Sequence, residues 1–273
     1  MLGAPQFRQL LDRTAVVCPF ATPAATPETE PLTCSQWATK YLEFQPSDRQ
    51  REALDSDARF LMLCCNRQWG KSTVISVKAL HAALTTPKTN IILMARSKEQ
   101  AGLVIEKAGE GAFLLGHKIR RVLGNRFSLQ FSNGSTISAI AHNEFTVLGR
   151  TAQIVIVDEA AVVTDRVYFA IEAFVSRSKG KIWLLSTPTR QSGFFYNYWH
   201  EETKIWHKIF SNVEDCPEID RDFLDLQMRS NPTRYRQDFL CEFIQPANRL
   251  CSREFVRSML LDPKQSPKPG PRS

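Results

Sequence analysis

The sequence lacks a long apolar run, a Cys-x-x-Cys pair and a secretion signal. Its longest apolar runs, 60–65 and 154–157, have the length of strands, whereas a membrane-spanning helix needs about 18 consecutive apolar residues. The seven cysteines include no Cys-x-x-Cys pair, and an odd number lying partly inside apolar runs is typical of reduced core residues rather than of disulfides or a zinc site. The N-terminus does not have the basic, apolar and small-residue order of a signal peptide. We therefore expect a soluble, cytoplasmic protein with no membrane partner.

A large excess of one charge is also missing. Lys and Arg number 35 against 28 Asp and Glu, which gives a formal charge of +7 and an isoelectric point near 9.1. A basic surface attracts phosphate backbones, so this balance allows a polyanionic partner without requiring one. The basic segments 118–126 and 229–236 are candidate DNA contacts, although a solvated surface is the simpler explanation for groups of this size.

What is present is enough hydrophobic sequence for one sizeable domain. Hydrophobic residues make up 43% of the 273 residues, which suffices for a large core. Residues 1–33 are rich in Ala, Thr and Pro and predict an irregular extension, and residues 261–273 form a Pro- and Lys-rich tail that cannot continue a helix or a central strand. The folded unit is therefore expected at 34–260.

Between these limits, short apolar segments alternate with longer helical patterns. The apolar segments are rich in Ile, Val and Leu, which predicts an α/β fold with a mainly parallel sheet covered by helices on both faces. Two further segments flank Asn133-Gly134, the strongest short turn signal, and predict an inserted β-hairpin. The predicted strands are 60–64, 90–95, 126–131, 135–140, 154–157, 181–186 and 205–210, and the predicted helices are 71–84, 99–109, 167–176, 222–229 and 233–242.

Residues 65–73, Cys-Asn-Arg-Gln-Trp-Gly-Lys-Ser-Thr, follow the first predicted strand and open a helix. In such a Walker A turn, backbone amides, the helix N-terminus and a lysine bind the β- and γ-phosphates of a nucleotide. Cys65 stands where the strict motif has glycine, and an ordinary strand-to-helix turn is the alternative, but the flanking strand and helix favour phosphate binding. The candidate nucleotide-binding residues are Asn66, Arg67, Gln68, Trp69, Gly70, Lys71, Ser72 and Thr73, with the Ser72 hydroxyl also a candidate magnesium ligand.

Two adjacent carboxylates, Asp158 and Glu159, end the predicted strand 154–157. In a Walker B arrangement the first holds magnesium, and the second orients and deprotonates the attacking water. The alternative is that both only cap the following helix, whose first turn favours negative charge. That alternative weakens because nucleotides bind at the carboxyl ends of neighbouring strands in an open α/β sheet. We therefore predict that Lys71 and Asp158 share one site.

A third polar strand end, Ser186-Thr187-Pro188, closes the predicted strand 181–186. P-loop ATPases with a glutamate beside the Walker B aspartate have an additional strand between the two Walker strands, and a polar residue at its end faces the γ-phosphate. Ser186 and Thr187 are the candidates for that contact. A strand that simply stops before a proline is the alternative.

These motifs together resemble the large terminase subunit of tailed phages and prophages. The resemblance rests on their order within residues 37–260, because any one of them occurs by chance. It implies the fold of a P-loop NTPase of the additional-strand, catalytic-glutamate type. The segments that carry it are 44–50, 67–73, 133–135, 149–151, 156–161, 186–188, 193–196 and 235–243.

The resemblance implies an ATPase motor that drives double-stranded DNA into a preformed capsid in the cytoplasm of a bacterial host. Such a motor works as a homo-oligomeric ring on the portal protein, together with a small terminase subunit. The implied cofactors are ATP and Mg²⁺. Carried over residue by residue, Gln50 would contact the adenine, Lys71 and Ser72 the phosphates and metal, Asp158 the metal, and Glu159 the attacking water.

Two arginines receive implied roles that the sequence leaves open. Arg67 inside the Walker A turn would neutralise charge on the γ-phosphate in the transition state, as an arginine finger does. The alternative for Arg67 is a surface ion pair with a nearby carboxylate. Arg150 is either a second charge-sensing residue or part of a loop.

Complete members of the family continue into a nuclease domain, whereas this sequence ends in its Pro- and Lys-rich tail. We therefore expect no DNA cutting from this chain. A prophage remnant that binds nucleotide or DNA without turnover is one alternative, and a fragment of a two-lobed helicase is another. The helicase is disfavoured because only 86 residues follow Thr187, too few for a second lobe of about 100 residues or more.

Overall fold

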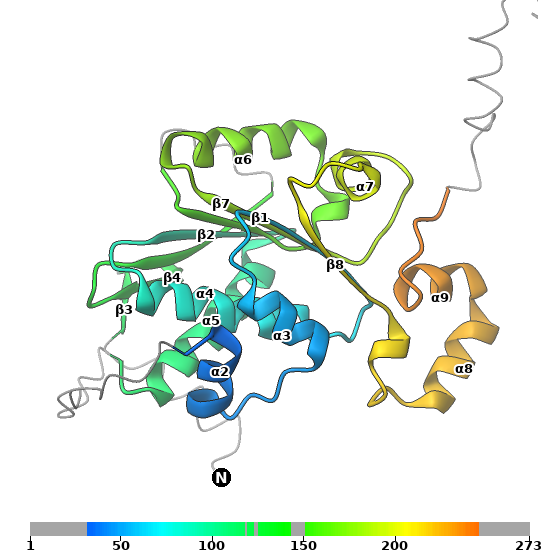
Figure 1. The fold of residues 1–273 in the computed structure, drawn as a ribbon, viewed down its shortest axis with the longest axis horizontal. Coiled ribbons are helices and arrows are strands. Elements are labelled where there is room, and N and C mark those ends of the chain that lie inside the picture. The colour runs from blue at the N-terminus through cyan, green and yellow to red at the C-terminus, as the bar shows by residue number, and fades with distance from the viewer. Residues whose placement is uncertain (1–31, 118, 123–124, 143–150, 246–273) are drawn as a thin grey trace, which may run out of the picture.

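The structure is a computed structural model that describes residues 32–117, 119–122, 125–142 and 151–245. Within these residues, eight strands form one sheet in the order β3-β4-β5-β2-β6-β7-β1-β8, with helices on both of its faces (Figure 1). The predicted α/β class is confirmed. The strands are β1 (Phe60–Cys65), β2 (Asn90–Ala95), β3 (Ile119–Val122), β4 (Asn125–Phe131), β5 (Thr136–Ala141), β6 (Ile154–Val157), β7 (Lys181–Ser186) and β8 (His207–Ser211).

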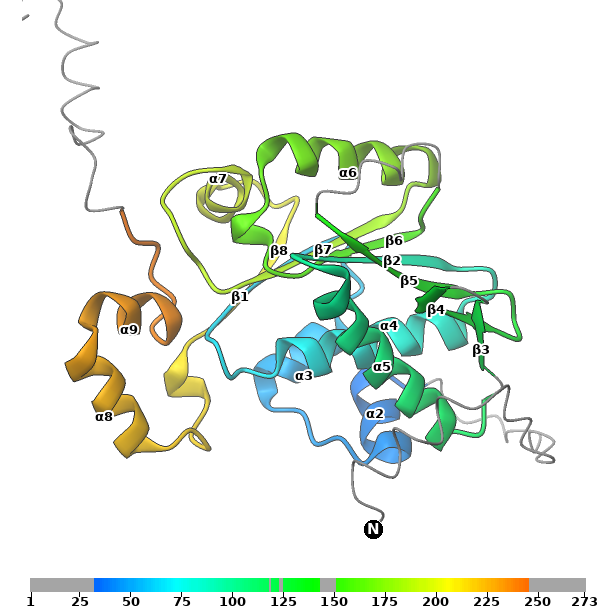
Figure 2. The ribbon, with the colours of Figure 1, turned by 180° about the vertical axis from the view of Figure 1, so that it is seen from behind.

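The helices form two layers that enclose the sheet. Helices α2 to α5 cover one face, and α6 and α7 cover the other, as the two opposite views show (Figures 1 and 2). The helices are α2 (Cys34–Leu42), α3 (Asp48–Asp55), α4 (Lys71–Thr85), α5 (Lys98–Leu114), α6 (Asp165–Ser178), α7 (Phe194–His200), α8 (Arg221–Ser230) and α9 (Pro232–Asp238), with short 3-10 turns η2 (Ala160–Val162) and η3 (Val213–Asp215).

The strand order places the polar strand ends side by side. All neighbours from β5 through β2, β6, β7 and β1 to β8 pair in parallel, so their carboxyl ends lie at one edge of the sheet. Strand β7 lies between β1 and β6, which is the predicted position of an additional strand between the two Walker strands. The strand ends at Cys65, Val157 and Ser186 are therefore neighbours.

Strand β1 shows why the central strands are apolar throughout. Leu61, Leu63 and Cys65 belong to the core beneath α2 to α5, whereas Met62 and Cys64 belong to the core beneath α6 and α7. All five are at most 1% exposed. Fully burying a large apolar side chain stabilises a fold by about 1.5–3 kcal/mol. Because the side chains of β1 alternate between the two cores, this strand contributes such stabilisation to the packing of both helical layers.

The predicted hairpin is part of a longer antiparallel arm. Strands β4 and β5 flank Asn133 and Gly134 as predicted, and Gly134 has the positive φ of +84° that this turn requires. The Asn133 amide donates to the Ala83 carbonyl at 2.8 Å, which attaches the turn to the end of α4. Strand β3 adds a third strand that pairs with β4. From the sequence, these residues were recognisable only as part of a basic segment.

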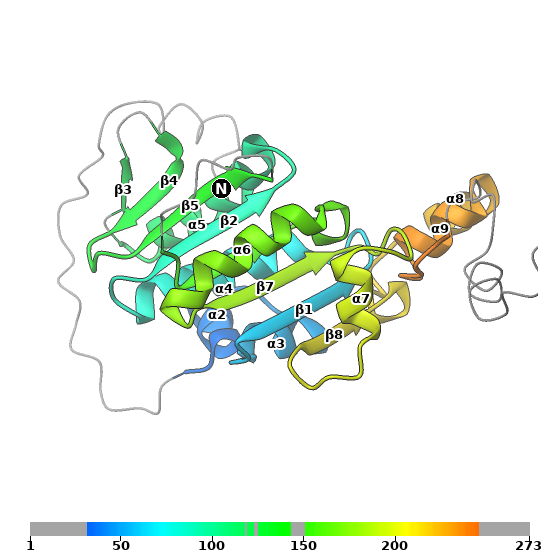
Figure 3. The same ribbon diagram turned by 90° about the horizontal axis from the view of Figure 1, so that it is seen from above.

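The C-terminal helices lie beyond the carboxyl ends of β1 and β7 (Figure 3). Helix α9 begins at Pro232, with the Asn231 side chain as its N-cap, and ends at Asp238 rather than at the predicted residue 242. The chain cannot stay helical there because Cys241 has a φ of +57°. The same geometry brings Glu242 back to form an ion pair with Arg236.

The composition predicts that the chain has no membrane-spanning helix and that its cysteines are reduced core residues. Among them, no helix combines the length and the apolar character that crossing a membrane requires. The cysteines in this part of the chain that are free and buried are Cys34, Cys64, Cys65, Cys216 and Cys241, which agrees with reduced core residues.

Candidate functional site

The turn between β1 and α4 has the geometry of a phosphate-binding loop. Gly70 is the N-cap of α4 and has a φ of +87°, a conformation that glycine adopts without steric cost. Helix α4 starts directly at Lys71, so its first amides and the positive end of its dipole lie at the turn. An anion placed there meets both the amides of Lys71 and Ser72 at the start of the helix and the lysine side chain.

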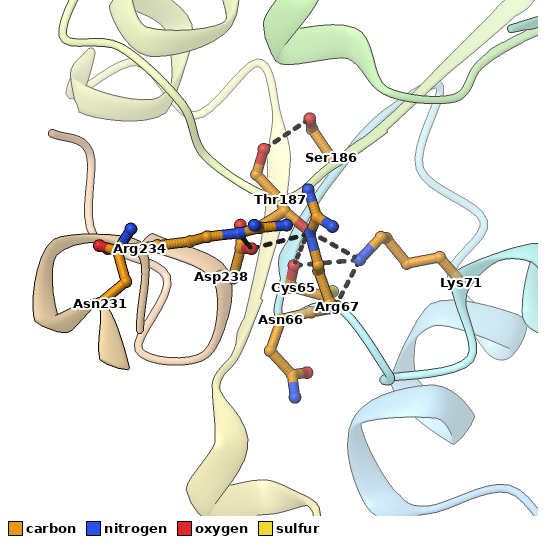
Figure 4. Close-up of polar contacts among 9 residues, drawn as sticks. All are labelled: Cys65, Asn66, Arg67, Lys71, Ser186, Thr187, Asn231, Arg234 and Asp238. Carbon is orange, nitrogen blue, oxygen red and sulfur yellow. Dashed lines mark hydrogen bonds and ion pairs between the residues drawn. The ribbon is translucent and has the colours of Figure 1, made fainter. Parts of the chain in front are cut away.

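The ammonium of Lys71 connects two of the predicted segments. It donates to the carbonyls of Cys65 at 3.1 Å and Asn66 at 2.5 Å, and to the Thr187 hydroxyl at 3.1 Å. The Thr187 hydroxyl in turn donates to the Cys65 carbonyl at 3.0 Å. Figure 4 shows these groups converging from the turn and from the end of β7. The two segments therefore meet at one point.

Several side chains of the turn are not directed at this point. Asn66 is fully buried, and its Oδ1 accepts a weak hydrogen bond from the Cys216 thiol. Trp69 is 2% exposed and belongs to the core beneath α2 to α5. Thr73 accepts from the Lys107 ammonium at 2.9 Å, and Gln68 is exposed. Any phosphate contact of Asn66 or Trp69 would therefore come from the backbone.

Gln50 lies against the turn, although its amide is already used by the protein. Its Nε2 donates to the Trp69 carbonyl at 2.7 Å, and its Oε1 accepts from the Ser47 amide at 3.0 Å as part of the capping box of α3. The proximity fits the predicted adenine contact, but contact through the amide would require one of these bonds to be exchanged.

Asp158 follows β6 and lies close enough to Lys71 for their charges to interact. Burial raises the pKa of the Asp158 carboxyl above its ordinary value, while the Glu159 amide and the Lys71 ammonium oppose this shift. The Glu159 amide donates to Asp158 Oδ1 at 2.9 Å. Asp158 and Lys71 therefore follow strands on either side of β7, at the same edge of the sheet.

Glu159 is held in an uncommon backbone conformation. Its φ is +53°, in the left-handed region that non-glycine residues rarely adopt. Although it precedes η2, its side chain makes no capping hydrogen bond there. The alternative that this carboxylate serves as a helix cap is therefore not what the structure shows. A strained position next to a buried carboxylate is typical of functional sites.

Ser186 and Thr187 perform different tasks. The Ser186 hydroxyl accepts from the Ala161 amide at 3.1 Å and donates to the Thr187 carbonyl at 2.8 Å, so it connects the end of β7 to the segment after Glu159. Thr187 alone reaches the Lys71 ammonium. Of the two candidate sensors, the structure brings only the Thr187 side chain to the ammonium of Lys71.

Arg67 lies at the same turn and is paired with a carboxylate. Its Nε is 3.0 Å from Oδ2 of Asp238 at the end of α9, and its backbone amide donates to the Asp238 carbonyl at 2.9 Å. The surface ion pair named as the alternative for Arg67 is therefore present.

The residues predicted for magnesium have the right chemistry to hold it. The Ser72 hydroxyl forms no hydrogen bond with another described residue, and only one oxygen of Asp158 is used, by the Glu159 amide. Oxygen ligands of this kind suit Mg²⁺, which is usually held by one or two protein groups together with substrate phosphates and water. No group of three or more His, Cys, Asp or Glu within the described residues could hold a metal by itself.

Sequence reasoning missed His142 and Asp238. His142 follows β5, and its Nε2 forms a hydrogen bond with the Asp158 carbonyl at 3.1 Å. Burial lowers the pKa of the His142 imidazole. The one signal for His142 was its position just after a predicted strand, whereas Asp238 lies inside a segment that only the family resemblance had marked.

The structure describes only some of the candidate DNA-contact residues. Lys118 lies outside the described residues, and so does Arg150, the candidate charge-sensing residue. In the segment 229–236, Arg234 is paired with Asp238 and Arg236 with Glu242. Arg229 is exposed and forms no ion pair with another described residue.

Comparisons with known proteins agree on one family. A family model described as "Terminase large subunit, T4likevirus-type, N-terminal" matches residues 62–255. The "Probable terminase, large subunit" of Enterobacteria phage P7 is 25% identical over 68% of this chain and 44% of its own length, so this chain spans less than half of that relative.

Solved structures share the fold. The large terminase ATPase domain of Thermus phage P74-26 has a TM-score of 0.67 at 22% identity, and the match covers 78% of this chain and all of that one. The large terminase of a thermophilic bacteriophage, solved in complex with ADP, has a TM-score of 0.63 at 15% identity, covering 72% of this chain and 54% of that one.

Proposed function

This chain belongs to the T4likevirus-type N-terminal family of terminase large subunits, and we propose that it is a magnesium-dependent ATPase that drives double-stranded DNA into a viral capsid. The observation that carries the proposal is the contact between Lys71 and Thr187 at the carboxyl ends of β1 and β7, with Asp158 at the end of the neighbouring strand β6. Two solved relatives support it: one is a large terminase ATPase domain, and the other is a large terminase in complex with ADP.

ATP binding would use the start of α4. The first amides of this helix and the Lys71 ammonium would hold the β- and γ-phosphates, with the carbonyls of Cys65 and Asn66 exchanged for phosphate oxygens. Gln50 would contact the adenine from its place beside the turn. Ser72 and Asp158 would hold Mg²⁺, which supplies positive charge that neutralises the phosphates.

Hydrolysis would require a base and a group that responds to the γ-phosphate. Glu159 would orient the attacking water and accept its proton. Its left-handed backbone conformation sets the direction in which its side chain leaves the chain. Thr187, already bonded to Lys71, would contact the γ-phosphate. Arg67 would place positive charge against the same group in the transition state.

The remaining roles follow from the family. Such a motor would engage double-stranded DNA, the portal protein and a small terminase subunit, and would act as a ring in the cytoplasm of a bacterial host. Contacts between a motor and DNA go mainly to the backbone and depend on lysine and arginine. Arg229 at the end of α8 is the described residue of segment 229–236 best placed for this role, because its charge is not paired within the described residues.

The proposal is tested by ATP hydrolysis of the purified chain with and without Mg²⁺. We expect turnover in wild type, and a loss of about 100-fold or more in Glu159→Gln with little change in ATP affinity, because the amide cannot accept the proton. Glu202→Gln, at an exposed carboxylate, is the matched control and should keep wild-type activity. Full activity in Glu159→Gln would refute the assignment of the base, and nucleotide binding without turnover in wild type would indicate an inactive remnant.

A further inference from the structure

The carboxylate of Asp238 lies between two arginines from different parts of the chain. Its Oδ2 is 3.0 Å from Nε of Arg67 in the turn after β1, and 3.0 Å from Nε of Arg234 on α9. Figure 4 shows Asp238 between the two, with Lys71 on the other side of Arg67. Only 4% of the Asp238 side chain is exposed, against 58% for Arg67 and 59% for Arg234. The buried member of this cluster is therefore the carboxylate.

Backbone bonds fix Asp238 relative to the phosphate-binding turn. The Arg67 amide donates to the Asp238 carbonyl at 2.9 Å, and the next carbonyl, of Phe239, accepts from the Val213 amide at 2.9 Å. The Asn231 side chain caps α9 by accepting from the Arg234 amide at 2.9 Å. The carboxylate thus has a defined position before any nucleotide is bound.

The ion pair leaves the phosphate-binding end of Arg67 open. Its contact to Asp238 is through Nε, and the terminal nitrogens form no hydrogen bond with a described residue. A guanidinium held at Nε presents its two terminal nitrogens as a fork that matches phosphate oxygens. Fixing an arginine beforehand also removes rotamer freedom that would otherwise be lost on binding.

We infer that Asp238 is a positioning residue: it holds Arg67 at Nε so that the terminal nitrogens are directed at the γ-phosphate of ATP. The inference rests on the proposed function, because it takes that phosphate as the target of Arg67. The ion pair and the phosphate contact, considered as alternatives for Arg67, are then compatible, because the ion pair orients the guanidinium for the phosphate contact. It also assigns to the end of α9 a part in the chemistry at the turn after β1.

The test uses Asp238→Asn, which removes the charge and leaves two largely exposed arginines free to turn to solvent, so the fold should persist. We expect a fall in kcat of at least about tenfold with a KM for ATP that changes less than about threefold, because a misdirected group costs mainly transition-state stabilisation. Asp238→Glu keeps the charge and should recover part of the loss. Asp57→Asn makes the same substitution in an exposed ion pair with Lys181 and serves as the control, with wild-type kcat expected.

A double substitution shows whether Asp238 acts through Arg67. In an Arg67→Ala background, Asp238→Asn should lower kcat no further, because the group to be positioned is gone. A similar fall in both backgrounds would overturn the inference and indicate a structural role. So would a kcat for Asp238→Asn within about twofold of wild type.

A binding measurement separates this inference from the proposed function. Wild type should bind ATPγS more tightly than ADP, and Asp238→Asn should reduce this preference, whether or not the chain turns over ATP. An unchanged preference overturns the positioning role and leaves the ATPase proposal standing. A wild-type chain that binds neither nucleotide would overturn both.

Discussion

The ammonium of Lys71 lies 3.1 Å from the hydroxyl of Thr187, 116 residues further along the chain. Both groups also donate to the Cys65 carbonyl, at 3.1 and 3.0 Å. One acceptor at the end of β1 therefore fixes the relative positions of the Lys71 ammonium and the end of β7. A change in the position of the Cys65 carbonyl, the Lys71 ammonium or the Thr187 hydroxyl should therefore displace the other two groups.

The Thr187 hydroxyl should affect both stability and turnover. Thr187→Val keeps the shape but leaves the Cys65 carbonyl and the Lys71 ammonium with one partner fewer, so we expect a loss of about 1 kcal/mol in the free energy of unfolding. The kcat for ATP should fall as well, because Lys71 is less well placed. Denaturant unfolding and ATPase assays measure the two effects. Thr187→Ser is the control, and a serine variant as impaired as the valine would contradict the role of the hydroxyl.

Replacing Gly70 should weaken ATP binding as well as the stability of the fold. A Cβ here would lie 3.2 Å from Gln50 Nε2, and the φ of +87° disfavours alanine. Gly70→Ala should therefore cost about 1–2 kcal/mol for the left-handed backbone, displace Gln50 and weaken ATP binding. Gly116→Ala is the matched control, because Gly116 has a φ of +70° with nothing within 4 Å. Equal ATP affinity in the two variants would show that Gln50 is not part of the site.

Lys71 should dominate nucleotide affinity. Lys71→Met removes the charge while keeping the length of the side chain, and a hydrogen bond to a charged group contributes about 1.5–3 kcal/mol. We therefore expect the dissociation constant for ATP to rise about 10- to 100-fold, measured by calorimetry or with a fluorescent nucleotide. Lys204→Met, at an exposed lysine, should bind ATP as wild type does. Unchanged binding by Lys71→Met would place the phosphates elsewhere.

The elements that the sequence predicted well are those whose signal is local. The strand 90–95 agrees at both ends with β2, and the strand-turn-helix around Lys71 agrees within a residue, because apolar runs and a Gly-Lys turn are read directly from neighbouring residues. The meeting of Lys71 and Asp158 followed from one general rule about parallel strands. The strand order agrees with that rule, because β6 and β1 lie on either side of β7 and all three run in parallel.

The features that were missed depend on pairing with distant residues. Strand β3 has a basic four-residue sequence, and only its register with β4 makes it a strand. Asp238 could not be singled out because its partner Arg67 is far away along the chain. The early end of α9 likewise depends on the left-handed conformation of Cys241, which no local pattern indicates for a cysteine.

Lys78 is a buried charge whose protonation should be visible in the stability of the fold. It lies on α4, 6% exposed, and donates to the carbonyls of Leu54 at 2.7 Å and Ser56 at 2.8 Å at the end of α3. Its ammonium is 5.0 Å from the centre of the Trp183 ring. Burial lowers the pKa of Lys78 from 10.5 to about 8. These contacts therefore compensate only part of the loss of hydration.

The sign of the pH dependence follows from the lowered pKa. Below about pH 8 Lys78 is protonated in both states, and the folded state bears the full cost of the buried charge. Between about pH 8 and 10.5 the unfolded chain binds more protons, so the contribution of Lys78 to stability rises with pH. The free energy of unfolding of wild type relative to Lys78→Met should therefore increase by up to about 3 kcal/mol over this range. Neighbouring groups, among them Cys34, Lys181 and Asp55, are present in both proteins, so the difference reports Lys78 together with its interactions with them. Urea unfolding at about pH 7.5, 9 and 10.5 measures it, with Lys204→Met as the control. A difference that stays constant with pH would show that Lys78 keeps its proton in the folded protein.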